Sequence, residues 1–276
     1  MIKKVLVYTY GDQSHEAAIQ AAASFAFQHD AQISGLFVRP DYVGYSGFYG
    51  EYPLNLAKTF YDLQDDYAKH AQSQFETIVS NYDCRSQWHE IEQFEKKPKP
   101  SLYTDVIFIS QPDSESNVIF NDTDFVDRLI IETGLPIIIV PKTWSSDGFA
   151  QHPALGWKET REAAAAVRHA LPLMRSAKQV DIVTITKQSD LDQELVESIG
   201  ISEYLTEHGV KCQYFYERMI EPEHDHSETL IRHVKDKECD LIIIGGYGHS
   251  RFREIVLGGM TRDLIKNSPV PVLMSH

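Results

Sequence analysis

The segment Asp240-Leu241-Ile242-Ile243-Ile244-Gly245-Gly246-Tyr247-Gly248 joins an uninterrupted apolar run to a glycine-rich stretch. Apolar runs of this length are typical of strands that are buried on both faces of a parallel sheet. Glycines after such a strand let the backbone approach a ligand closely at the carboxyl edge of the sheet. The segment therefore predicts an α/β fold with a ligand site directly after the strand.

The same order of elements occurs twice in the chain. Each copy has a short apolar strand, a helix rich in small apolar residues and a second strand, with Thr160 as a candidate cap for the helix of the second copy. The matching strands are Val5–Tyr8 with Pro153–Trp157, Ile33–Val38 with Val180–Ile185, Asp105–Ile109 with Asp240–Ile244, and Leu135–Pro141 with Ser268–Met274. This repeat predicts two tandem doubly wound domains, residues 1–143 and 151–276, each with a mainly parallel five-stranded sheet.

The last strand of each copy is flanked by proline and would lie at a sheet edge. An uncovered edge leaves backbone donors and acceptors unpaired. Two similar domains can cover each other, so we expect Ile137–Val140 and Val270–Leu273 to meet near an internal pseudo-twofold axis. The alternative is that each edge is shielded separately.

The spacing of Gly245, Gly248 and Gly258 resembles the phosphate-binding signature of the universal stress protein family, G-x2-G-x9-G-[S/T]. The flanking strand, the following helix and the duplicated chain match as well. The resemblance implies that Gly245, Gly246 and Gly248 lie beside the ribose and phosphates of ATP or another adenine nucleotide, with or without Mg²⁺. It also implies that Gly258, Gly259 and Met260 present N–H groups to the phosphate tail. Separately, the positive charge of Arg251 or Arg253, which flank the glycine loop, is expected to assist anion binding.

Two departures from the family pattern affect this expectation. Gly259 stands where the family has Ser or Thr, so a hydroxyl that could contact the terminal phosphate or its metal is lost. Lys158 stands where nucleotide-binding members carry an Asp at the end of the first strand. A lysine can meet a phosphate but cannot accept a hydrogen bond from the nucleoside.

The first domain departs further from the pattern. Its equivalent loop, Ile109–Ser116, contains no glycine and carries Pro112, Asp113 and Glu115. Proline removes a donor, and the two carboxylates would repel a phosphate. We expect this domain to be degenerate and any nucleotide to bind in the second domain.

The composition excludes some classes of function. The formal net charge of -14 disfavours binding to nucleic acid, and no apolar stretch is long enough to span a membrane. The cysteines Cys84, Cys212 and Cys239 are widely spaced without a Cys-x-x-Cys pair, which indicates reduced, mostly buried thiols and a cytoplasmic location. No metal site is expected in Glu223–Glu228, because Asp225 and Glu228 have the spacing of a helix start.

Three functions are consistent with these residues. The first is a stress-response regulator that binds an adenine nucleotide and alters contact with an unknown protein partner. The second is a slow ATP hydrolase, although no Walker-type lysine or general base beside His249 is evident, and no catalytic residue is assigned. The third is an interaction protein without nucleotide, for which the aromatic segment 42–61 would be a partner surface. Pairing of two chains is left open.

Overall fold

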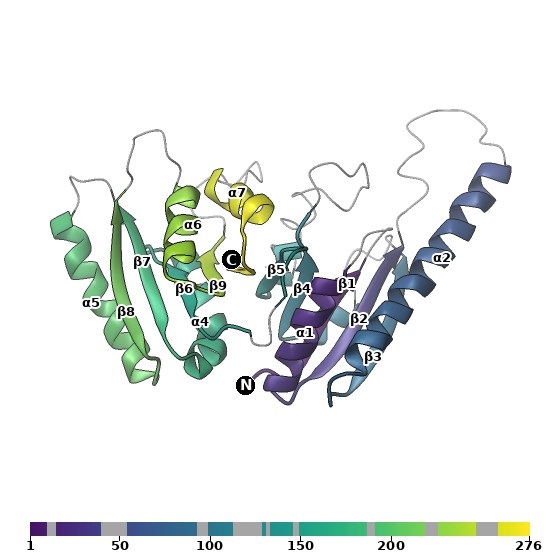
Figure 1. Cartoon of the computed structure of the whole chain (residues 1–276), viewed down its shortest axis with the longest axis horizontal. Helices are drawn as coiled ribbons and strands as arrows, with labels where there is room; N and C mark the ends of the chain where they lie inside the picture. The colour runs from purple at the N-terminus through teal and green to yellow at the C-terminus, as the bar shows by residue number, and fades with distance from the viewer. Residues whose placement is uncertain are drawn as a thin grey trace.

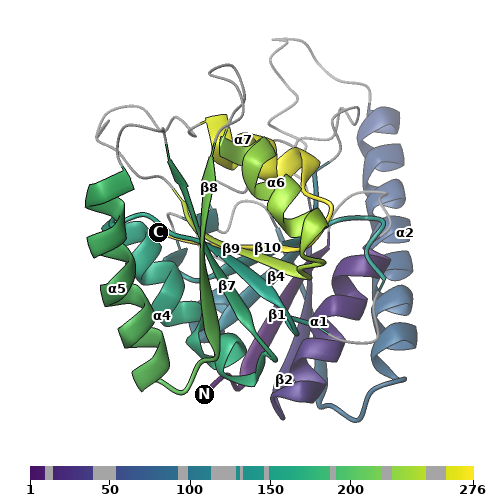
Figure 2. The ribbon, with the colours of Figure 1, turned by 60° about the vertical axis from the view of Figure 1, so that its left-hand side comes forward.

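The computed structural model describes residues 1–9, 15–39, 54–92, 99–112, 129–130, 133–145, 149–186, 191–218, 226–246 and 259–276. These residues form one ten-stranded sheet with helices on both faces (Figures 1 and 2). Among the described residues, no helix combines the length and the apolar content needed to cross a bilayer.

The described part of the first half contains five strands and two long helices. Its elements are β1 (Lys4–Thr9), α1 (Glu16–Gln28), β2 (Gln32–Arg39), α2 (Leu54–Val79), β3 (Ser86–Glu92), the short 3-10 helix η2 (Lys99–Tyr103), β4 (Val106–Ser110) and β5 (Ile137–Val140).

The second half repeats this order. Its elements are β6 (Pro153–Gly156), α4 (Arg161–Ser176), β7 (Val180–Thr186), α5 (Leu191–Glu207), β8 (Cys212–Arg218), α6 (His226–Asp236), β9 (Leu241–Gly245), α7 (Gly259–Asn267) and β10 (Val272–Ser275).

The strand order confirms the predicted fold class. It reads β3-β2-β1-β4-β5-β10-β9-β6-β7-β8, so each half has the same internal order and the two halves run in opposite directions from the centre. All pairs within a half are parallel, and β5 pairs with β10 in antiparallel fashion. Antiparallel pairing of two equivalent strands is the arrangement that a twofold axis produces.

The central pairing is the one expected from the proline-flanked final strands. Ile138 lies opposite Leu273, with Ile137 opposite Met274 and Ile139 opposite Val272. The pairing begins two residues later in the second domain than expected, because the strand there is Val272–Ser275. Each terminal strand thus satisfies its backbone groups on the other, and the apolar sheet continues through the chain.

Alternation along each strand divides the core into two layers. Val5 and Val7 of β1 face the side covered by α1, α2, α4 and α5, whereas Leu6 and Tyr8 face the side covered by α6 and α7. Since both faces are covered, the inner strands carry apolar side chains in both directions, as the uninterrupted runs predicted. In Figure 1, α2 and α5 lie at opposite ends of the sheet.

Candidate functional site

The candidate nucleotide site lies at the carboxyl edge of the second half, between β6 and β9. These strands are neighbours, with Gly156 opposite Ile244. From β6 the chain passes through α4 to β7 on one side, and from β9 it passes through α7 to β10 on the other. Connections that diverge in this way open a crevice at the carboxyl ends of the strands, which is where open α/β sheets bind ligands.

Gly245 is a glycine for reasons of packing. A Cβ atom at this position would lie 2.4 Å from the backbone nitrogen of Ala163 and 2.5 Å from the carbonyl carbon of Glu162. The end of β9 therefore passes directly against the first turn of α4. The φ angle of Gly245 is not positive, so the close approach alone requires glycine here.

The other predicted residues on described segments occupy different positions near the carboxyl ends of β6 and β9. The N–H of Gly246 donates to the carbonyl of Ser275 at 2.7 Å, so this group is already paired within the sheet edge. Gly259 is exposed at the start of α7, and Met260 follows it, half-buried against the core. Backbone N–H groups in a first helical turn have no partner within the helix and suit an anion.

Gly248, Arg251 and Gly258 lie outside the described residues. The same holds for His249 and Arg253.

Lys158 is exposed immediately beyond β6. The preceding residue, Trp157, donates its backbone N–H to the carbonyl of Val183 at 2.9 Å, which holds this segment to β7. The indole nitrogen of Trp157 is buried and has no hydrogen-bond acceptor among the described residues. An exposed cation and a buried indole donor thus follow one another directly after β6.

The first turn of α4 carries its own charges. Thr160 caps the helix, because its hydroxyl accepts from the N–H of Ala163 at 3.2 Å, as the sequence predicted. Burial raises the pKa of the Glu162 carboxyl, but hydrogen bonds from Arg161, its own backbone N–H and Thr160 outweigh burial and lower the pKa overall. Glu162 is therefore an anion at neutral pH, and Arg161 pairs with it.

At the equivalent edge of the first half, larger residues stand in the positions of Gly245 and Gly246. Ser110 ends β4 where Gly245 ends β9, and its hydroxyl contacts Nδ1 of the buried His15 at 3.0 Å. Gln111 donates its backbone N–H to Val140, as Gly246 does to Ser275, and its side chain reaches the carbonyl of Ser268. Asp113 and Glu115 lie outside the described residues.

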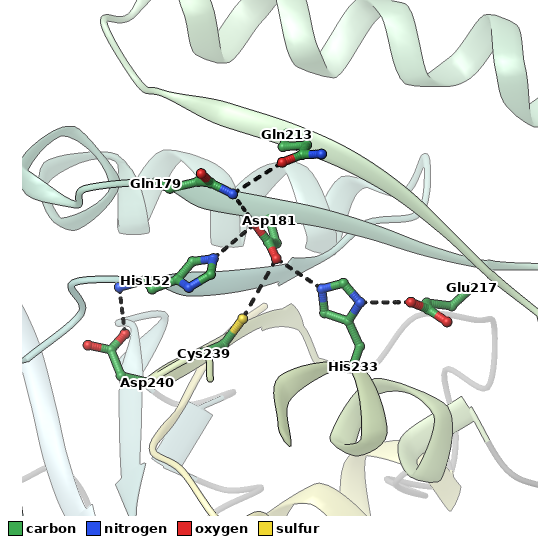
Figure 3. A network of polar contacts seen from close by, with 8 residues as sticks. All are labelled: His152, Gln179, Asp181, Gln213, Glu217, His233, Cys239 and Asp240. Carbon is green, nitrogen blue, oxygen red and sulfur yellow. Dashed lines mark hydrogen bonds and ion pairs between the residues drawn. The ribbon is translucent and has the colours of Figure 1, made fainter. Parts of the chain in front are cut away.

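A second group of polar side chains lies at the opposite, amino edge of the second half, and the sequence analysis missed it (Figure 3). Nε2 of His152 lies 3.0 Å from Oδ1 of the fully buried Asp181, and Nε2 of the buried His233 lies 3.1 Å from Oδ2. Cys239 Sγ lies 3.9 Å from the same carboxylate. Nδ1 of His233 also contacts Glu217 at 2.8 Å.

The environment of this group shifts two pKa values in opposite directions. Burial raises the pKa of Asp181, but hydrogen bonds from His152, Gln179 and His233 outweigh it and lower the pKa overall. Burial, together with the charges of Asp181 and Asp240, raises the pKa of the Cys239 thiol to about 12. Cys84 and Cys212 are half-buried and Cys239 is buried, and all three are free thiols.

Comparison with known proteins agrees with the fold. A profile of the universal stress protein family matches residues 155–276. A universal stress protein of Archaeoglobus fulgidus has the same fold over 98% of this chain and 97% of its own, with a TM-score of 0.68 and 12% identity. Residues 155–276 belong to the universal stress protein family, and the whole chain has the fold of its members.

Other universal stress proteins show how the similarity is distributed. A family member of Synechocystis sp. is 30% identical over 92 residues, and one of Methanocaldococcus jannaschii is 38% identical over 47 residues. These segments cover 33% and 17% of this chain and 30% and 29% of the two relatives. A Pseudomonas aeruginosa protein with the same family designation covers 99% of this chain with a TM-score of 0.60, at 12% identity and over 93% of its own length. The fold is thus shared over the whole chain, while the profile match lies in the second half.

Proposed function

We propose that this universal stress protein is a regulator that binds one adenine nucleotide between the carboxyl ends of β6 and β9. The observation that carries the proposal is the coincidence of the glycine spacing with the point where the connections of the sheet diverge. The bound state would alter contact with a protein partner, in keeping with a binding protein that has no assigned catalytic residue.

The described residues offer complementary contacts for such a ligand. In this proposal the first turn of α7 would supply backbone donors at Gly259 and Met260, and the exposed Lys158, just after β6, would supply a cation. The indole N–H of Trp157 is a further donor that could be used by the ligand. Gly245 would shape the crevice through its contact with α4, while Gly248, Gly258 and Arg251 would act from the loop between β9 and α7.

The proposal assigns the phosphates to the second domain alone. The overall charge of -14 opposes any anion, so local donors must provide the attraction. In the first domain, the hydroxyl of Ser110 is engaged with His15, and Gln111 occupies the place of Gly246. A stoichiometry of one nucleotide per chain follows from this difference.

Calorimetric titration of the nucleotide-stripped full chain with MgATP tests the proposal. We expect saturable binding of one equivalent, abolished by Gly258→Asp, which places a carboxylate in the phosphate loop. Gly200→Asp on α5 is the matched control, because it adds the same charge at an exposed position with no atom within 4 Å of its Cβ. Titration at several temperatures is needed, since the heat of binding can pass through zero at one of them.

Lys158 allows a finer test of the same site. Lys158→Gln should weaken binding about tenfold, the lower end of the effect of a charge-assisted hydrogen bond, and Lys158→Arg should restore most of it. Equal affinities for all three proteins would remove Lys158 from the site. No binding at any temperature, or binding that survives Gly258→Asp, would refute the nucleotide proposal and favour an interaction module.

A further inference from the structure

Three chemically different ligand groups converge at the amino edge of β6, β7 and β9. They are the imidazole of His152, the carboxylate of Asp181 and the thiol of Cys239, and their ligand atoms all lie within 4.8 Å of one another. Residue 152 directly precedes β6, Asp181 is the second residue of β7, and Cys239 lies two residues before β9. Figure 3 shows the three side chains pointing toward a common centre from these separate strands.

Such a donor set suits Zn²⁺, which binds imidazole nitrogen, carboxylate oxygen and thiolate sulfur in tetrahedral geometry. With bond lengths of about 2.0–2.3 Å, neighbouring ligand atoms around zinc are separated by roughly 3.3–3.7 Å. The separations here are 3.0 Å for His152–Asp181 and 3.9 Å for Cys239–Asp181. Small side-chain adjustments would therefore suffice. We propose that His152, Asp181 and Cys239 bind a divalent transition-metal ion, with Zn²⁺ as the preferred ion and water as its fourth ligand.

The surrounding residues hold these groups in position. Asp240 accepts hydrogen bonds from the backbone N–H groups of Gln151 at 2.6 Å and His152 at 2.8 Å, which fixes the segment that carries the imidazole. Gln179 donates to Oδ1 of Asp181 at 2.9 Å, and His233 holds Oδ2 while contacting Glu217 through its other ring nitrogen. Carboxylate–histidine chains of this kind orient the ligands of metal sites.

The internal duplication shows that the fold itself does not require this cluster. Asp105 caps the segment before β1 as Asp240 caps the segment before β6, so Lys4 is the counterpart of His152 and Thr104 that of Cys239. The strand registers make Ser34 the counterpart of Asp181. The first half builds the same backbone without any of the three ligands. The three ligands are therefore specific to the second half.

Metal binding at this site is coupled to the release of a proton. The neutral thiol of Cys239 loses its proton to solvent when the sulfur–metal bond forms, so each bound ion releases one proton. His152 binds through the lone pair of Nε2 and keeps its proton on Nδ1, and Asp181 binds as the carboxylate. The side chain of His152 is 27% exposed while that of Asp181 is fully buried, so the ion reaches the site from the His152 side.

Cobalt provides the most specific test, because Co²⁺ substitutes for Zn²⁺ and a cobalt–thiolate bond has a charge-transfer absorption. The full chain is stripped with a chelator, kept reduced and titrated with Co²⁺, after which Zn²⁺ is added in competition. We expect the absorption to saturate at one equivalent and to disappear when Zn²⁺ displaces Co²⁺. Cys239→Ser should abolish the absorption, whereas Cys212→Ser, which removes a half-buried thiol on β8, should leave it intact.

His152→Gln tests the site without disturbing its buried members. We expect it to weaken Zn²⁺ binding by at least about tenfold, because loss of even an outer-shell partner costs about 10–100-fold in metal affinity. Thermal unfolding of each chelator-treated variant establishes that it is folded. If Cys239→Ser does not fold, the Zn²⁺ affinity of His152→Gln tests the metal site instead. A missing charge-transfer absorption, an absorption that survives Cys239→Ser, or unchanged affinity in a folded His152→Gln variant would show that the cluster is a structural hydrogen-bond network only.

Discussion

Replacement of Gly245 by alanine should destabilise the chain even without ligand. The added Cβ would lie 2.4 Å from the nitrogen and 2.8 Å from the Cα of Ala163, and 2.5 Å from the carbonyl carbon of Glu162. All three atoms belong to the backbone of the first turn of α4, so no side-chain rotation relieves the overlap. The strand or the helix must move, and overpacking of this kind costs about 1–3 kcal/mol.

Gly246→Ala is the matched control for this prediction. Its Cβ would have Ser275 O as its nearest neighbour at 3.6 Å, an ordinary contact, and its φ angle is not positive. Urea denaturation of the nucleotide-free protein should show a lower free energy of unfolding for Gly245→Ala and a change within about 0.5 kcal/mol for Gly246→Ala. Equal stability of Gly245→Ala and the unchanged chain would refute the packing argument and leave ligand binding as the reason for this glycine.

Three further predictions concern the elements around the site and the domain junction. Thr160→Ala removes the cap of α4 and should lower the free energy of unfolding by about 1 kcal/mol in urea denaturation, with Thr160→Ser retaining most of it. Because the pKa of Glu162 is lowered, its carboxylate stabilises the fold above the unfolded pKa, and this stabilisation is lost as the pH falls through the folded pKa. The free energy of unfolding, measured across this acidic range, should therefore fall less steeply for Glu162→Gln than for the unchanged chain. An unchanged slope would count against a lowered pKa of Glu162. Ile138 and Leu273 pair across the junction, so a double-mutant cycle with alanine should give a coupling energy of at least about 0.5 kcal/mol, whereas additive effects would indicate that the pairing is absent in solution.

The fold was largely predictable because its inner strands are buried on both faces. Runs such as Ile107–Ile109 and Ile242–Ile244 are apolar in every position, which is typical of a strand that both layers of helices cover. The sequence repeat predicts five strands in each half but indicates the positions of only four. β3 and β8 lie at the outer edges of the sheet and mix polar with aromatic residues, so their sequences do not indicate a buried strand.

The candidate nucleotide site was predicted only in outline. The glycine spacing predicts a site at the carboxyl edge of β9, but it cannot show that Gly245 serves the contact with α4 or that the N–H of Gly246 is used by Ser275. Both facts depend on how closely two distant segments approach. The roles of Gly248, Arg251 and Gly258 stay predictions.

The amino-edge cluster could not be found from local motifs. His152, Asp181 and Cys239 lie on or just before three strands that are separated along the chain and become neighbours only through the sheet order. The one visible signal was Asp181, a carboxylate within the apolar run Val180–Ile185, because a buried charge requires partners. The histidines at 224 and 226 form a more obvious metal-binding pattern in the sequence, because they are close together along the chain.

Hydrogen exchange of the full chain with and without saturating MgATP tests whether the second domain alone receives an adenine nucleotide, because both copies of the repeat are observed in one experiment. We expect slower exchange across Gly245–Met260 and no change across Ile109–Ser116. Unchanged exchange at Gly245–Met260, or equal protection of both segments, would contradict this expectation.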